Sequence, residues 1–285
     1  MHWKSTLVYK MESLNQRKRK SKGKWFSNSK KAKYSICPGQ RGFLVFCNNK
    51  EKEAIKEARI LFDEYLPKFN DDTTEIEPED KDEENQESGD DFDEAESEVK
   101  EMKETKEKDD SCKLMNSGVQ NVLFFKTKLK NPVGFALSIL DDIQETQQQK
   151  TRFLMRFIPI EATCKAHKEN FEMSVKKLLV KHFENISEVK TYSVIFKARC
   201  NNDFTKDLAI RICGDVIKEM DKESKAKVEY KNPDLVIMVE VMKGNICLGI
   251  LPKYFNYKKY NLIELANVTK AETKQDESSD RNVNE

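Results

Sequence analysis

This sequence has few of the patterns on which membrane proteins and secreted proteins depend. No apolar stretch in its 285 residues approaches the roughly 18–20 residues that a membrane-spanning helix needs. The first residues also lack the continuous apolar core of a signal peptide. We therefore expect an intracellular protein without a membrane segment.

Cysteine is present but not clustered. The seven cysteines show no C-x-x-C spacing, and an odd, scattered set is typical of reduced thiols in the cytosol or nucleus. Because free cysteine usually behaves as a small apolar side chain, we expect most of them to be buried. Only three histidines accompany them, so a zinc site is not expected.

Recognisable catalytic motifs are also missing. PGQRGF lacks the glycine spacing and the following helix of a phosphate-binding loop, and there is no G-x-S-x-G or H-E-x-x-H pattern. Cys164 and His167 are the one thiol–imidazole pair that is close in sequence, and a helix N-terminus there would lower the thiol pKa. Packing is the favoured explanation, because no orienting group or oxyanion hole accompanies them. The sequence predicts a protein without catalytic residues, metal, cofactor or small-molecule substrate.

Charge is abundant and strongly segregated. Residues 1–35 carry eleven Lys/Arg and one acid, whereas residues 71–110 carry twenty-one acids and five lysines. Such segments cannot bury a core, so we predict a disordered basic arm at 1–35 and a disordered acidic insertion at 70–112. RKRKSKGK at Arg17–Lys24 suits nuclear import or nonspecific nucleic-acid contact, which favours the nucleus or nucleolus and admits the cytoplasm. The insertion is explained as a solvated spacer; the alternatives are that it mimics a polyanion or that it masks the basic arm.

Hydrophobic periodicity predicts a small mixed unit on either side of the insertion. A strand at Gly42–Cys47 precedes a helix over about Lys50–Leu66. A strand over Asn121–Thr127, a helix from Pro132 and a strand over Arg152–Ile160 follow the insertion. This order fits a split βαβ, ferredoxin-like arrangement.

A second set of elements completes an α+β (mixed α/β) fold class. We expect that EATCKAHKEN leads into a helix that ends near Phe183, and that a strand over Tyr192–Arg199 and a helix over about Thr205–Met220 follow. After a short strand near Val228–Tyr230, LVIMVEV is typical of a central strand buried on both faces. A turn at Lys243–Asn245 leads to a last strand, ICLGIL.

Positive charge is interleaved with planar side chains near the ends of these strands. Lys and Arg neutralise phosphates, Asn hydrogen-bonds to phosphate, sugar or base edges, and Arg planes or Tyr rings stack on unpaired bases. The tyrosines of KYFNYKKYNL are included for that reason. For each residue alone, a solvated surface is an equally good explanation, so the hypothesis depends on several clusters meeting on one side.

Four segments carry a resemblance to a known family. RFIPIEATCKAH, KARCNND, KNPDLVIMVEV and KYFNYKKYNL resemble a THUMP domain, and the preceding unit resembles the ferredoxin-like domain that accompanies THUMP in RNA-modifying systems. With the basic residues 16–33, GFLVFC and the acidic residues 70–112, the order resembles the THUMP-domain adaptors of tRNA cytidine acetylation. The resemblance implies a basic arm at 1–35, a ferredoxin-like domain at 36–150, a THUMP domain at 151–262 and a disordered tail at 263–285.

This resemblance implies tRNA binding without catalysis. Such adaptors bring leucine and serine tRNAs to an RNA cytidine acetyltransferase, which forms N4-acetylcytidine with its own acetyl-CoA and ATP. Transferred to the matching positions, the RNA-binding residues are Arg152, Arg156, Lys165, Lys197, Arg199, Asn201, Asn202, Lys253, Lys258 and Lys259. The alternatives are a protein-interaction module that docks through the acidic insertion and basic arm, and an RNA-modifying enzyme with an unrecognised site.

Overall fold

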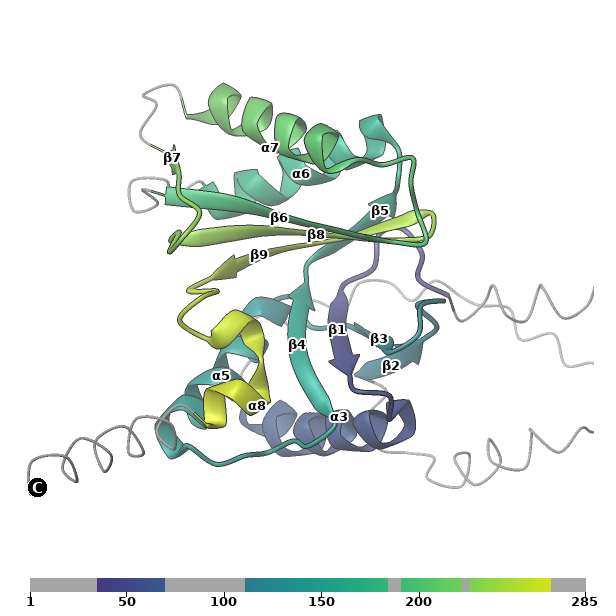
Figure 1. Cartoon of the computed structure of the whole chain (residues 1–285), viewed down its shortest axis with the longest axis vertical. Coiled ribbons are helices and arrows are strands. Elements are labelled where there is room, and N and C mark those ends of the chain that lie inside the picture. Colours follow the sequence, from purple (N-terminus) through teal and green to yellow (C-terminus); the bar gives the residue numbers. More distant parts are fainter. Residues whose placement is uncertain (1–34, 70–110, 184–190, 222–225, 268–285) are drawn as a thin grey trace, which may run out of the picture. The chain divides into compact units, whose positions relative to one another are not determined.

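The computed structural model describes residues 35–69, 111–183, 191–221 and 226–267 (Figure 1). The described residues from Ile36 onward belong to one compact unit. Nearly all of the predicted basic arm, nearly all of the predicted acidic insertion and the tail beyond residue 267 lie outside the described residues. Within the described part, no helix is long and apolar enough to cross a membrane.

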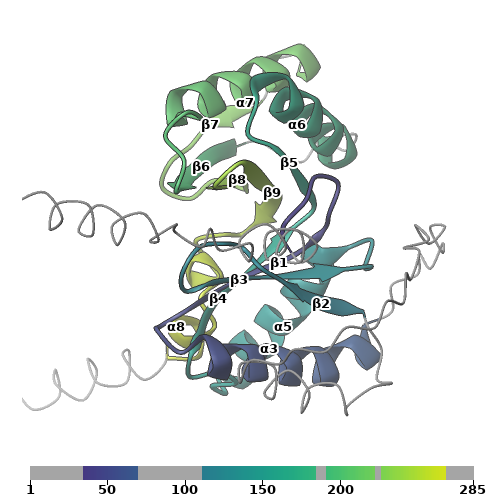
Figure 2. The same ribbon diagram turned by 90° about the vertical axis from the view of Figure 1, so that its right-hand side faces the viewer.

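The first sheet has four antiparallel strands in the order β2-β3-β1-β4. Its elements are β1 (Gly42–Cys47), α3 (Glu51–Tyr65), the 3₁₀ helix η3 (Leu66–Lys68), β2 (Cys112–Met115), β3 (Val122–Thr127), α5 (Pro132–Thr146) and β4 (Leu154–Ile160). The order β-α-β-β-α-β with this strand arrangement confirms the predicted ferredoxin-like fold. Helices α3 and α5 cover one face of the sheet (Figure 2).

The periodicity missed strand β2. The predicted insertion extended to residue 112, but Cys112 pairs with Thr127 and Met115 with Phe124. β2 lies at the edge of the sheet and buries only Met115, so it lacks the apolar alternation of a core strand. The predicted insertion therefore extended too far, because the strand begins at Cys112.

Five phenylalanines fill the space between the first sheet and its helices. Strands β1, β3 and β4 and helices α3 and α5 contribute Phe43, Phe125, Phe157, Phe62 and Phe135. Contacting pairs of these rings have centroids 4.7–6.5 Å apart, which is the range of favourable aromatic contacts. This packing fixes the helix-covered face and leaves the other face of the sheet for a different partner.

The second sheet has five strands in the order β5-β9-β8-β6-β7. Its elements are β5 (Ala162–Lys165), α6 (Lys168–Phe183), β6 (Thr191–Arg199), α7 (Lys206–Met220), β7 (Lys227–Val228), β8 (Leu235–Met242) and β9 (Asn245–Pro252). β6 pairs in parallel with β7 and β8, while β9 is antiparallel to β8 and β5. α6 and α7 lie on one face of this sheet (Figure 1), and residues 236–242 of β8 are all buried, which confirms the central strand.

One strand of the second sheet was not predicted. Residues 162–165 were described only as part of the segment that leads into a helix, but they form β5, and Cys164 pairs with Ile246. The helix begins only at Lys168. Thr163 and Cys164 are both buried, because one side chain faces each side of the sheet, and so short a segment has no clear periodicity.

The helix-free faces of the two sheets pack against each other. Leu44 and Phe124 of the first sheet share one apolar cluster with Met238 and Leu251 of the second. At Gly249 a Cβ atom would lie 2.4 Å from the Pro159 carbonyl oxygen, so β9 and β4 approach closely. A separate cluster lies between the second sheet and its helices.

The chain passes from the first sheet to the second at Glu161, and the domain boundary at 150/151 stays a prediction. β4 pairs with β1 and so belongs to the first sheet, and the Glu161 backbone N–H donates to Leu248 of the second. The buried Glu161 carboxylate is hydrogen-bonded to His182 Nε2 at 2.8 Å and accepts from the Ile250 N–H at 3.1 Å.

The segment after β9 returns to the first sheet. It contains the 3₁₀ helix η5 (Lys258–Tyr260) and α8 (Leu262–Ala266), which lies near α5 and β4 (Figure 1). The predicted tail began at 263, but residues up to Ala266 are helical and Leu265 is buried. Asn261 caps α8 with its side-chain oxygen, which accepts from the Ile263 and Glu264 N–H groups.

Candidate nucleic-acid interface

Three strand ends and one turn meet at one edge of the second sheet. Lys165, the last residue of β5, pairs with Asn245 of β9. Arg199, the last residue of β6, pairs with Met242 of β8, and the Lys243 N–H donates to the Arg199 carbonyl. The structure therefore brings together several of the predicted residues, and we call Lys165, Arg199, Asn201, Asn202 and Lys243 the basic edge.

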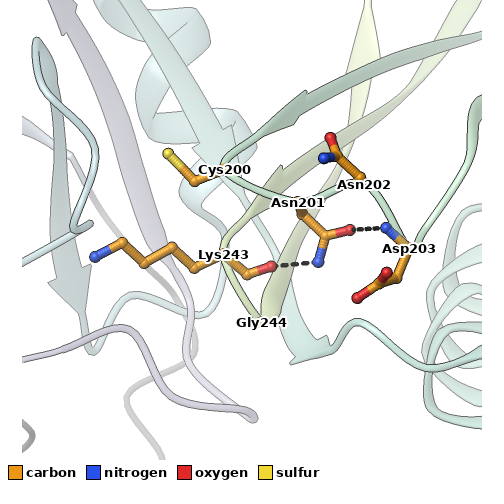
Figure 3. A pocket seen from close by; sticks show the side chains of 6 residues that line it. All are labelled: Cys200, Asn201, Asn202, Asp203, Lys243 and Gly244. Carbon is orange, nitrogen blue, oxygen red and sulfur yellow. Dashed lines mark hydrogen bonds between the residues drawn. The ribbon is translucent and has the colours of Figure 1, made fainter.

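An open pocket of about 500 Å³ lies at this edge (Figure 3). It is lined by residues 200–203 after β6 and by Lys243 and Gly244 of the β8–β9 turn. Asn202 is exposed. The Asn201 amide donates to the Lys243 carbonyl at 2.5 Å, and its oxygen accepts from the N–H groups of Asp203 and Phe204. The Asn201 side chain therefore stabilises the loop through these intramolecular hydrogen bonds.

Lys243 is a residue that the sequence analysis left out. It is exposed, and a Cβ atom at Gly118 of the β2–β3 loop would lie 2.5 Å from its Nζ. Its ammonium group therefore lies beside the first sheet's loop. The sequence did show a lysine at the turn between two strands, but Lys243 was interpreted as a turn residue and not as a possible RNA contact.

A second group of cations lies where the two helix-free faces meet. Lys197 and Arg199 project from β6 on the same face as Glu240 of β8, and Arg199 Nε lies 3.5 Å from Glu240 Oε2. The Arg199 guanidinium also lies 5.1 Å from the centroid of the Phe46 ring on β1. Arg156 of β4 pairs with Phe46. We call Arg156, Lys197 and Arg199 the basic cluster.

Arg152 precedes β4 in a segment fixed by helix α3. The Glu57 carboxylate accepts hydrogen bonds from the backbone N–H groups of Arg152, Phe153 and Leu154 at 2.8–3.2 Å. Arg152 is exposed, and its guanidinium carbon lies 5.4 Å from the Phe153 ring centroid. The start of β4, and with it the backbone of Arg152, is therefore held by charge-assisted hydrogen bonds to the half-buried Glu57 carboxylate.

The first sheet adds two lysines that the sequence analysis also missed. Lys113 of β2 and Lys126 of β3 are exposed and directly opposite each other. Lys126 pairs with Gly42 of β1, so it lies on the same sheet face as Arg156, the partner of Phe46 four residues along β1. Two further cations therefore lie on the helix-free side of the first sheet.

The three lysines after β9 lie elsewhere. Lys253 follows β9, whose eight residues separate it from the β8–β9 turn by about 25 Å at the usual rise per residue. Lys258 and Lys259 are exposed on the segment that packs against the first sheet. The structure therefore does not join these three lysines to the basic edge.

The tyrosines of the same segment are not available for stacking on bases. Tyr254, Tyr257 and Tyr260 are 3%, 4% and 0% exposed. The Tyr257 hydroxyl donates to Asp141 Oδ1 at 2.6 Å and the Tyr260 hydroxyl to the Pro252 carbonyl at 3.0 Å. The prediction of stacking tyrosines is wrong, because these rings complete the apolar core beneath α8.

Nucleophilic chemistry at Cys164 receives no support from its surroundings. Its side chain is 4% exposed, burial raises the pKa of the thiol, and His167 is exposed on the following turn. Four of the seven cysteines are buried, as expected, and none forms a disulfide. In the described ranges there is no group of three or more His, Cys, Asp or Glu side chains placed to hold a metal ion.

Comparison with known families agrees with this architecture. A family model described as THUMP domain matches residues 165–251, from the end of β5 to the end of β9. The chain therefore joins a ferredoxin-like unit to a THUMP domain. That combination places the chain in the class of THUMP-domain proteins.

Three relatives extend the similarity beyond the domain. THUMP domain-containing protein 1 homolog of Drosophila melanogaster is 34% identical, over 90% of this chain and 85% of the relative. THUMP domain-containing protein 1 of Homo sapiens is 30% identical, over 80% and 64%. tRNA acetyltransferase TAN1 of Saccharomyces cerevisiae is 27% identical, over 88% and 94%. The chain belongs to the THUMP domain-containing protein 1 family, and it spans just under two thirds of the human member.

Proposed function

We propose that this protein is a non-catalytic adaptor that binds tRNA and presents it to an RNA cytidine acetyltransferase for N4-acetylcytidine formation. The observation that carries the proposal is the meeting of cations from both sheets. Arg199 belongs to the basic edge and to the basic cluster, Arg156 joins it from β4, and Lys243 lies beside the β2–β3 loop. A polyanion with regularly spaced phosphates suits such a surface.

The relatives support tRNA as the polyanion. The yeast relative is named a tRNA acetyltransferase and is similar over 88% of this chain. Leucine and serine tRNAs are the substrates that the family resemblance implies, and acetyl-CoA and ATP would be bound by the partner enzyme. The adaptor's own part would be to hold and orient RNA.

Fluorescence anisotropy with a structured tRNA, repeated across salt concentrations, tests RNA binding. Affinity should fall steeply with salt, with a logarithmic slope of about 0.7–0.9 per phosphate contacted. Replacing Lys197 and Arg199 by Ala should weaken binding and make the slope shallower. If the double variant binds as well as the wild type while deletion of residues 1–35 abolishes binding, the folded domain is not the RNA-binding element.

The name of the yeast relative favours one other candidate, an acetyltransferase that acts by itself. Purified protein with acetyl-CoA, ATP and tRNA separates the two. The adaptor proposal expects no acetylcytidine until an RNA cytidine acetyltransferase is added, and a lower acetylcytidine content in tRNA from cells that lack this protein. Product from the purified protein alone would contradict it.

A further inference from the structure

Glu240 is a buried carboxylate among cations that come from both sheets. It is 3% exposed and lies opposite Lys197 in the parallel pairing of β6 with β8. Burial raises the pKa of the Glu240 carboxyl, and the positive charges of Arg199, Lys197 and Arg156 oppose that rise. The residue is thus the one negative charge at the centre of the basic cluster, within the part of the chain that the structure describes.

Arg199 is held between this carboxylate and an aromatic ring. Its Nε lies 3.5 Å from Glu240 Oε2 on the second sheet, and its guanidinium carbon lies 5.1 Å from the Phe46 ring centroid on the first. The side chain of Arg199 remains 30% exposed. Nε is therefore in the interior, while another part of the Arg199 side chain reaches the surface.

The fold alone does not account for this arrangement. Neither Arg199 Nε nor Glu240 Oε2 has a hydrogen-bond partner among the described residues, although buried polar atoms are normally hydrogen-bonded. An ion pair that is buried and imperfectly paired contributes little to stability, and apolar side chains of similar volume often serve a core better. A role outside folding explains why a carboxylate occupies this position.

We propose that Glu240 is a positioning residue for RNA binding, whose carboxylate holds the Arg199 side chain against Phe46 and directs the exposed part of the guanidinium toward an RNA phosphate. This inference rests on the proposed tRNA binding. Glu240 itself does not contact RNA. It acts through Arg199, and it restricts a long side chain that would otherwise lose rotamer freedom when RNA binds.

Two possible roles of Glu240 predict opposite changes in RNA affinity when its charge is removed. If Glu240 were only a counter-charge, its removal would leave three uncompensated cations and RNA would bind more tightly. If it positions Arg199, its removal weakens binding even though the surface becomes more positive. The sign of the change in affinity therefore decides between the two roles.

The experiment measures tRNA binding by anisotropy with the full chain and four variants, Glu240→Gln, Arg199→Ala, the double variant and Glu172→Gln. Glu172 is exposed on α6, on the other side of the second sheet, so it controls for the loss of one negative charge. We expect Glu240→Gln to weaken binding about tenfold, as the loss of one charge-assisted contact does. In the Arg199→Ala background the same change should have no further effect, and Glu172→Gln should bind as the wild type does.

Two results would overturn the proposal. One is wild-type or tighter binding by a folded Glu240→Gln protein. The other is a double variant whose loss of tRNA affinity equals the product of the two single-variant losses, since Glu240 would then act independently of Arg199. If the wild type fails to bind tRNA, the proposed function fails. If the wild type binds and Arg199→Ala changes nothing, the positioning role of Glu240 fails while the proposed function stands.

Phe46→Leu supplies an arm that does not depend on the folding of the Glu240 variant. It removes the ring beside the guanidinium and leaves the carboxylate in place. Thermal unfolding establishes that the variant is folded at the assay temperature. The proposal expects weaker tRNA binding by Phe46→Leu, and unchanged binding by the folded variant would contradict it.

Discussion

At the level of single residues, burial gives side chains of one type different roles. Tyr254, Tyr257 and Tyr260 are nearly inaccessible to solvent. Lys258 and Lys259, which lie between the last two tyrosines in the sequence, are exposed. Both lysines have positive φ, at 50° and 61°, a conformation that costs non-glycine residues about 1 kcal/mol or more. The buried tyrosines stabilise a turn that its own backbone disfavours.

Glu240 should make stability depend on pH. Its ordinary pKa is 4.5, and burial raises it in the folded chain, so the folded state binds a proton that the unfolded state has already released. The stability contributed by Glu240 is therefore present below pH 4.5 and is lost as pH rises through the folded-state pKa. The free energy of unfolding of Glu240→Gln, minus that of the wild type, should grow across this window in urea titrations. A difference that shrinks with rising pH would show that the cations outweigh burial.

At the level of elements, each sheet has a helix-covered face and a face that packs on the other sheet. The chain crosses from one to the other at Glu161, between β4 and β5. Two contacts fix this arrangement locally, the Glu57 carboxylate at the start of β4 and the close approach of Gly249 to Pro159. Each contact can be tested with a matched control.

Glu57→Gln should lower the free energy of unfolding by about 1–3 kcal/mol, because three backbone N–H groups lose a charged acceptor. Glu53→Gln is the control on the same helix, since among the described residues Glu53 forms a surface ion pair with Lys56 at 3.5 Å. That change should cost at most about 0.5 kcal/mol. Chemical denaturation measures both changes. Equal losses in the free energy of unfolding would show that the Glu57 contact with the start of β4 does not stabilise the fold more than a surface ion pair does.

Gly249→Ala should destabilise the protein by about 1–3 kcal/mol, the usual cost of overpacking. The new methyl group would meet the Pro159 carbonyl at 2.4 Å, and a backbone atom cannot rotate away. Gly214→Ala is the control, because it lies within α7 and its Cβ would meet nothing within 4 Å. That change should stabilise by up to about 1 kcal/mol. Thermal or urea unfolding compares the two, and a neutral Gly249→Ala would contradict the close approach of the strands.

At the level of the whole molecule, a net charge of +1 conceals segments of opposite sign. Residues 71–110 hold twenty-one acids and five lysines, and they are tethered between η3 and β2, the strand that carries Lys113. This segment should therefore reduce the attraction of the folded part for polyanions over about one Debye length.

Replacing residues 71–110 by a neutral Gly/Ser linker of equal length should tighten tRNA binding at low salt. The gain should disappear as salt screens the charges, because the effect is long-range and electrostatic. Anisotropy at several salt concentrations measures it, and a linker that keeps the original acids in shuffled order should behave as the wild type. Equal affinity of the neutral-linker and wild-type proteins at every salt concentration would refute a role for this charge.

From the sequence we could predict most of the element types, the ferredoxin-like arrangement, the central position of LVIMVEV and the segregation of charge, because apolar period and composition are local properties. The prediction omitted β2 and β5, short strands whose pairing depends on neighbours distant in the chain. The burial of the tyrosines near residue 257 depends on the packed sheets, since an amphipathic ring can lie on a surface or in a core. The proximity of Arg156 and Arg199 to the Glu240 carboxylate depends on them too, because two sheets have to pack face to face before cations from both can surround one carboxylate.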